Sequence, residues 1–141
     1  MGMFSNSLNR MVLIISITFI IASFTQKSYC TTSHCADSLA VFISGVLGFY
    51  LSWAGSTWLA NPLLIVSWIT INRKPKLSWI TSALAAILSL SFLLFNQIMD
   101  NEGGFYSQIM SYKLGYWLWV ASSLSMLIGN SFLYFSKPKQ A

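Results

Sequence analysis

Two cysteines and one histidine are the residues of this chain whose types and spacing are most suggestive of chemistry. Cys30 and Cys35 are separated by four residues, and His34, the only histidine, lies between them. Outside the cytosol such a pair favours a local disulfide, with two free thiols or a metal site as alternatives. A metal site is disfavoured because one loop supplies no clear fourth ligand, and the spacing is not the C-x-x-C of disulfide oxidoreductases. The sequence therefore predicts a disulfide, no metal centre and no cofactor.

Asn61 and Pro62 form the most suggestive polar pair inside an apolar segment. Proline lacks a backbone N–H, so it leaves a carbonyl of the preceding turn unpaired. A carboxamide beside such a helix break can coordinate a ligand, as it does in transporters. Alternatively, Asn61 satisfies the freed carbonyl or a neighbouring helix. We favour this packing role, because no charged residue lies in the same stretch to complete a binding site.

Catalysis and nucleic-acid binding are both disfavoured by the distribution of charged residues. The three acidic residues are Asp37, Asp100 and Glu102, and the last two lie in an Asp-Asn-Glu-Gly-Gly stretch typical of a solvated turn. A cation site at Asp100 and Glu102 remains an alternative. No glycine-rich phosphate loop is present. The net charge is +5, but no basic cluster is interleaved with aromatic residues, so we predict neither an enzyme nor a nucleic-acid-binding protein.

The composition of the chain indicates that lipid is its solvent. Hydrophobic residues make up 55% and charged residues 8% of the 141 residues, whereas soluble domains carry about 25% charged residues. Strict alternation of apolar and polar residues is absent, which favours helices over a barrel. The sequence predicts an all-α four-helix bundle, one transmembrane domain over residues 1–141, with spans at about 8–25, 54–71, 77–95 and 114–135.

The second apolar segment is too long for a single straight span. Residues 38–71 contain no charge, and 34 residues of helix would measure about 50 Å. We therefore predict a long broken second helical segment, with a partly embedded outer helix at about 38–52 and a bend at Gly55. Small residues recur every four positions along it and predict a helix-packing face, within the bundle or between copies: Ser44, Gly48, Ser52, Ser56 and Ala60.

The basic residues predict the orientation, because Lys and Arg favour cytosolic loops. If the N-terminus is cytosolic, six basic residues face the cytosol and only Lys27 and Lys113 face outward. Both termini are then cytosolic. The first segment also fits a cleaved signal peptide, with Ser28 and Cys30 at the small-residue positions of the cleavage site. We favour a retained span.

Two stretches resemble a loose group of short, uncharacterised bacterial four-span membrane proteins. They are Trp58–Leu64 with the following Ser67 and Trp68, and Gly115-Tyr116-Trp117-Leu118-Trp119. The resemblance implies a setting in the bacterial inner membrane and no particular activity.

Three functional hypotheses follow from these observations, and the weakest is a membrane enzyme, which would rest only on Cys30, His34 and Cys35. The leading one is a non-catalytic accessory or scaffolding subunit, whose partners are the lipid bilayer and a second copy or another membrane protein. The alternative is a small passive transporter or channel, or a binder of a hydrophobic ligand. The apolar segments contain no acidic residue, which argues against proton coupling.

Overall fold

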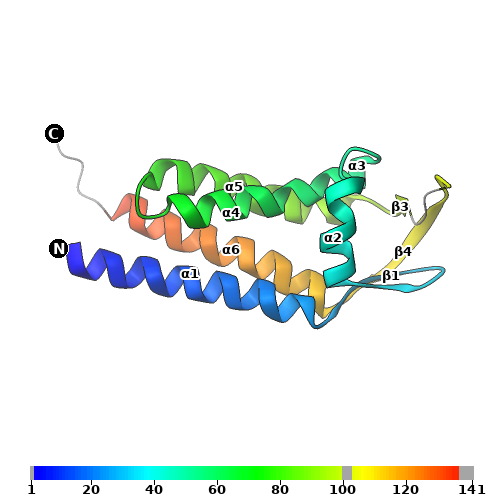
Figure 1. Cartoon of the computed structure of the whole chain (residues 1–141), viewed down its shortest axis with the longest axis horizontal. Coiled ribbons are helices and arrows are strands. Elements are labelled where there is room, and N and C mark those ends of the chain that lie inside the picture. Colours follow the sequence, from blue (N-terminus) through cyan, green and yellow to red (C-terminus); the bar gives the residue numbers. More distant parts are fainter. Residues whose placement is uncertain (1, 100–102, 137–141) are drawn as a thin grey trace.

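The computed structural model describes residues 2–99 and 103–136, and their side chains from residue 6 onward. It is mostly helical (Figure 1). The helices are α1 (Gly2–Phe24), α2 (Ser38–Gly48), α3 (Trp53–Ser56), the 3-10 turn η1 (Thr57–Leu59), α4 (Ala60–Thr70), α5 (Pro75–Ser91), the 3-10 turn η2 (Phe92–Leu94) and α6 (Leu114–Phe135).

A four-stranded antiparallel sheet overturns the prediction of a purely all-α four-helix bundle. Its strands are β1 (Lys27–Thr31), β2 (Cys35–Asp37), β3 (Gln97–Met99) and β4 (Tyr106–Tyr112), in the order β2-β1-β4-β3. The two hairpins lie in the segments 26–37 and 96–113, where no helix was predicted. Pairing of β1 with β4 joins these two distant segments into one sheet at one end of the molecule.

The long helices run side by side, and the two ends of the resulting bundle differ chemically (Figure 1). The start of α1, the turn between α4 and α5 and the end of α6 lie together, and Asn9 Nδ2 donates to Asn72 Oδ1 at 2.7 Å there. We call this the basic end, because Arg73, Lys74 and Lys76 lie in or beside that turn. The opposite end carries the sheet and α2, and we call it the sheet end. Lys137 and Lys139 lie outside the described residues.

Three helices within the described residues are long and apolar enough to cross a membrane. They are Asn6–Phe24, Pro75–Leu94 and Leu114–Phe135. A fourth crossing arises if α2 and the helix Trp53–Thr70, which meet at an angle of 107°, count as one broken span. These assignments rest on length and hydropathy, and they agree with the lipid environment that the composition indicates.

The distribution of side chains is the reverse of that in a water-soluble protein. Several serines are fully buried between the helices, whereas large aliphatic residues face outward. Ile14 is 64% exposed, Ile87 62% and Ile128 68%. A water-facing surface would leave this apolar area exposed to water at a substantial free-energy cost, and lipid removes that cost.

Pairs of buried serines hold neighbouring helices close together. Ser16 Oγ donates to the Ser122 carbonyl at 3.0 Å, and Ser122 Oγ donates to the Ser16 carbonyl at 2.7 Å, joining α1 to α6. Ser67 and Ser78 make the same reciprocal pair between α4 and α5, at 2.9 and 2.8 Å. Small residues allow this close approach, and interhelical hydrogen bonds then stabilise it.

The break in the second helical segment lies earlier than Gly55. Helix α2 ends at Gly48, and Ser52 caps the next helix by accepting a hydrogen bond from the Gly55 backbone N–H at 2.9 Å. The bend is fixed by the Trp58 indole, which donates to the Phe42 carbonyl at 2.9 Å.

The break also corrects the predicted packing face. Residues four apart share a face only along one continuous helix, so Ser44 and Gly48 on α2 do not line up with Ser52, Ser56 and Ala60. Ser44 is exposed, and only Ala60 of the five is buried. A Cβ on Gly48 would meet nothing within 4 Å, whereas a Cβ on Gly45 would overlap the Trp58 indole. The glycine that permits close packing is therefore Gly45.

Candidate functional site

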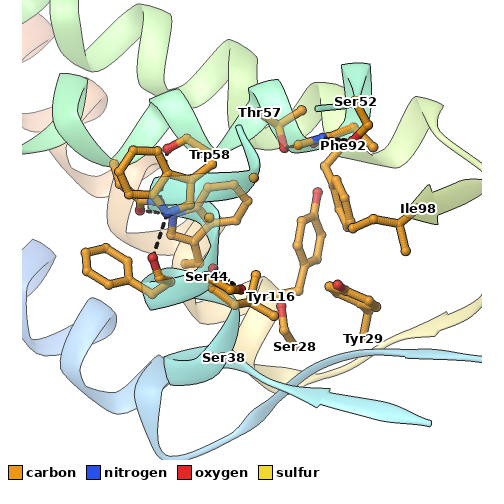
Figure 2. Close-up of a pocket in the computed structure, with 18 of the residues that line it drawn as sticks. Ser28, Tyr29, Ser38, Ser44, Ser52, Thr57, Trp58, Phe92, Ile98 and Tyr116 are labelled. Carbon is orange, nitrogen blue, oxygen red and sulfur yellow. Dashed lines mark hydrogen bonds between the residues drawn. The ribbon is translucent and has the colours of Figure 1, made fainter. Parts of the chain in front are cut away.

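A cavity of about 540 Å³ lies at the sheet end, enclosed by parts of the chain that are far apart in sequence (Figure 2). The end of α1, β1, α2, η1 and the first two turns of α6 all contribute to its wall. Ligand pockets commonly fall between about 300 and 1,000 Å³. Leu47, Tyr50 and Leu51 line the cavity and are exposed, so it is open on the side of α2.

The wall of the cavity is apolar and aromatic, and none of the described residues that line it is charged. Phe42, Trp58, Phe92 and Tyr116 supply much of its surface. Tyr116 is 1% exposed, and its hydroxyl donates to the Ser89 carbonyl at 2.9 Å. Burial raises the pKa of the neighbouring Tyr112, so this phenol stays neutral at physiological pH. A neutral, largely hydrophobic molecule fits this environment, and an ion does not.

Asn61 lines the cavity, but its side chain already has partners at both ends. Nδ2 donates to the Trp58 carbonyl at 3.1 Å, and Oδ1 accepts from Trp119 Nε1 at 2.8 Å. In a regular helix the backbone N–H of residue 62 would donate to the Trp58 carbonyl, four residues earlier. Pro62 has no N–H, so this carbonyl lacks that partner. Asn61 therefore repairs the proline gap and joins α4 to α6. Pro62 lies in the first turns of α4, where proline is well tolerated.

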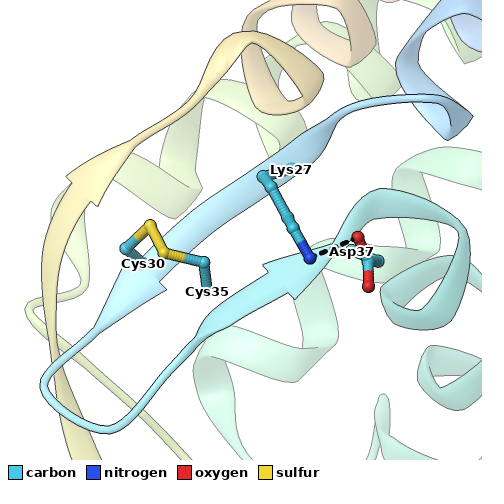
Figure 3. A network of polar contacts seen from close by, with 4 residues as sticks. All are labelled: Lys27, Cys30, Cys35 and Asp37. Atoms are coloured by element: carbon cyan, nitrogen blue, oxygen red, sulfur yellow. Dashed lines mark ion pairs between the residues drawn. A yellow bond between two sulfur atoms is a disulfide. The ribbon is translucent and has the colours of Figure 1, made fainter.

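Cys30 and Cys35 form a disulfide that closes the β1–β2 hairpin (Figure 3). They are directly opposite each other in the strand register. Beside them, Lys27 Nζ and Asp37 Oδ1 form an ion pair at 2.7 Å, with both side chains more than half exposed. Since the sulfurs are bonded to each other, they cannot act as thiolate ligands beside His34, which removes the Cys-His-Cys metal alternative.

No group of three or more metal-ligating side chains converges in the part of the chain that the structure describes. Asp100 and Glu102, the other candidate cation ligands, lie outside that part. The chemistry that the described residues support is non-covalent binding in the cavity.

A β-bulge in β1 shapes the floor of the cavity. Lys27 pairs with Asp37 and Tyr29 pairs with Ala36, so Ser28 is an extra residue between two consecutive pairs. Neighbouring residues of a regular strand point to opposite faces, whereas a bulge redirects one of them. As a result, Ser28 and Tyr29 both line the cavity.

No known protein family, curated protein or solved structure matches this chain. The function must therefore be inferred from the site itself.

Most residues of the cavity wall were not predicted from the sequence. Phe42, Trp58 and Tyr116 belong to apolar segments in which aromatic residues usually mark membrane interfaces. The signal that points to a cavity is the break after Gly48, because a helix that turns across a bundle leaves space beneath it. Of the predicted site residues, Asn61, Ser44, Gly48 and Ser52 line the cavity, while Pro62, Cys30 and Cys35 do not.

Proposed function

We propose that this protein is a non-catalytic membrane protein that binds a neutral, hydrophobic ligand in the cavity at its sheet end. The observation that carries the proposal is a space of about 540 Å³ with an aromatic wall, in which none of the lining residues that the structure describes is charged. Such a space excludes ions, because burying an unpaired charge there has a large free-energy cost. Of the functions that the sequence left open, the binder of a hydrophobic ligand is therefore the one we advance.

The same proposal places the protein in a bacterial inner membrane with both termini in the cytosol. Arg73, Lys74 and Lys76 at the basic end support this orientation through the preference of basic residues for the cytosolic side. The disulfide at the opposite end supports it independently, because disulfides persist in oxidising compartments. The cavity would then lie near the outer surface of the bilayer, within reach of molecules dissolved in the outer leaflet.

Helix α2 supports access from the lipid. It crosses the sheet end at a steep angle to the long helices (Figure 1) and exposes apolar side chains. Ile43 is 62% exposed and Leu47 72%. Exposed side chains of this kind are stabilised by contact with the acyl region of the bilayer and not by contact with water. A hydrophobic molecule can then enter the cavity beside α2 without passing through water.

Photolabelling in lipid nanodiscs tests the proposal. The probe is a diazirine-bearing analogue of 1-decanol, applied to the full chain and competed with unlabelled 1-decanol. We expect saturable labelling that the competitor removes. Val41→Trp, which fills the cavity from α2, should lower the labelling severalfold, because Val41 lines the space.

Val46→Trp is the matched control. Val46 lies on the same helix, is 51% exposed and is not among the residues that line the cavity. Labelling of this variant should equal that of the wild type. Labelling that does not saturate, or that both tryptophan variants reduce equally, would overturn the proposed function.

A further inference from the structure

The polar groups of the cavity wall are almost all occupied within the protein. Hydroxyls on several elements donate to nearby carbonyls, and both indole N–H groups that reach the wall also have acceptors. These donors and acceptors are Ser23 to Gly115 at 2.8 Å, Ser44 to Val41 at 3.4 Å, Thr57 to Ala54 at 2.7 Å, Tyr116 to Ser89 at 2.9 Å, Trp58 to Phe42 at 2.9 Å and Trp119 to Asn61 at 2.8 Å. A ligand therefore meets few free donors.

The Ser28 hydroxyl is an exception that faces the cavity. Ser28 is 8% exposed, and its Oγ makes no hydrogen bond to any residue that the structure describes. Ser38 at the same side of the cavity also has an unpaired Oγ, but that atom is sealed against Gly115. Figure 2 shows the Ser28 hydroxyl pointing up toward Tyr116, into the space that the labelled side chains surround. A hydroxyl that faces the cavity without a protein partner can donate a hydrogen bond to a polar group of a bound molecule.

The bulge explains how this hydroxyl reaches the cavity. Ser28 is the extra residue of β1 between the pairs Lys27–Asp37 and Tyr29–Ala36. Bulges commonly redirect a side chain next to a functional site. The disulfide between Cys30 and Cys35 closes the same hairpin two residues further along and constrains it.

We propose that the ligand is a neutral amphiphile with a single polar end, and that the Ser28 hydroxyl donates a hydrogen bond to its hydroxyl or carbonyl oxygen. The polar end lies at β1, and the hydrocarbon part lies against Phe42 and Trp58 on the other side of the cavity. A charged head group is disfavoured, since none of the described residues in the wall carries a charge to pair with it. This inference rests on the proposed function and specifies the chemical class of the ligand.

Competition by two molecules that differ only in their polar end tests the role of Ser28. Displacement of the photolabel is measured in nanodiscs with 1-decanol and with decane, at concentrations expressed as mole fraction of the lipid. In the wild type we expect decanol to compete about threefold to tenfold better than decane, which corresponds to one neutral hydrogen bond. Ser28→Ala should remove that preference and leave competition by decane unchanged.

Ser28→Ala should also leave the thermal stability unchanged, because the hydroxyl makes no hydrogen bond to lose. Ser44→Ala is the matched control, since its hydroxyl also lies on the cavity wall but is bonded to its own helix; it should keep the preference for decanol. A preference that persists in Ser28→Ala would overturn the assignment of Ser28 and leave the proposed function intact. Failure of both competitors in the wild type would overturn both.

Discussion

Replacing Asn61 with leucine separates a packing role from a ligand-binding role for this residue. Leucine has a similar volume but lacks the amide, so the change removes the donor to the Trp58 carbonyl and the acceptor for Trp119 Nε1. Asn61 is 5% exposed and lines the cavity. The Trp58 carbonyl and the Trp119 indole then both lose a partner.

The expected loss of stability follows from these two hydrogen bonds. Hydrogen bonds between membrane helices average about 0.6 kcal/mol, so the two together contribute about 1.2 kcal/mol. Leaving a buried polar group unsatisfied costs about 1–3 kcal/mol, and water in the cavity offsets part of that cost. We therefore expect Asn61→Leu to lower the free energy of unfolding by about 1–2 kcal/mol, with the decanol photolabelling retained.

Unfolding in mixed detergent micelles measures this change. Trp119→Phe removes the indole donor together with part of the ring system, so its own cost includes lost packing. The double variant with Asn61→Leu isolates the hydrogen bond and should show a coupling of about 0.5 kcal/mol or more. Asn6→Leu, at an exposed position on α1, controls for the added leucine and should be neutral. An unchanged unfolding free energy together with lost photolabelling would refute the packing role and assign Asn61 to the ligand.

Two further predictions concern the bend and the hairpin. Gly45→Ala should destabilise the protein by about 1–3 kcal/mol, because the new Cβ overlaps the Trp58 indole, while Gly48→Ala should be neutral; equal melting temperatures would contradict the fixed bend. A membrane-impermeant maleimide applied to intact cells should label Cys30 and Cys35 only after treatment with an impermeant reductant. Labelling without reduction would contradict the disulfide, and no labelling after reduction would contradict the proposed orientation.

The helical part of the fold is accessible from the sequence because lipid imposes simple requirements on it. Uncharged runs such as those of α5 and α6 must pair their backbone internally, so length and composition indicate helices. The excess length of residues 38–71 indicates a break for the same reason. The position of the break is not accessible, since it depends on Ser52 capping and on Trp58 packing against Gly45, which involve contacts between separate turns.

The sheet was not predicted because its strands lack the usual alternation. Strand β1 reads Lys-Ser-Tyr-Cys-Thr, in which polar and apolar residues do not alternate, and its last four residues are all buried. Strand β3 has only three residues, and β4 places serines on its less exposed side. The cross-strand position of Cys30 and Cys35 was the available signal, because two cysteines separated by four residues can close a hairpin.

The cavity could not be predicted from local patterns. Its wall combines residues from α1, β1, α2, η1 and α6, and the free hydroxyl of Ser28 depends on a bulge defined by pairing with β2. Asn61 was identifiable from sequence because the requirement it meets is local, a carbonyl freed by the next residue along the chain.

The most direct test of hydrophobic-ligand binding is to map where the decanol photoprobe attaches to the wild-type chain in nanodiscs. After irradiation, the protein is digested and the modified residues are identified by mass spectrometry. The proposal predicts attachment to residues that line the cavity, such as Phe42, Trp58 and Tyr116, and loss of these adducts when 1-decanol is added. Adducts confined to outward-facing residues such as Ile87 and Ile128, unaffected by the competitor, would contradict it.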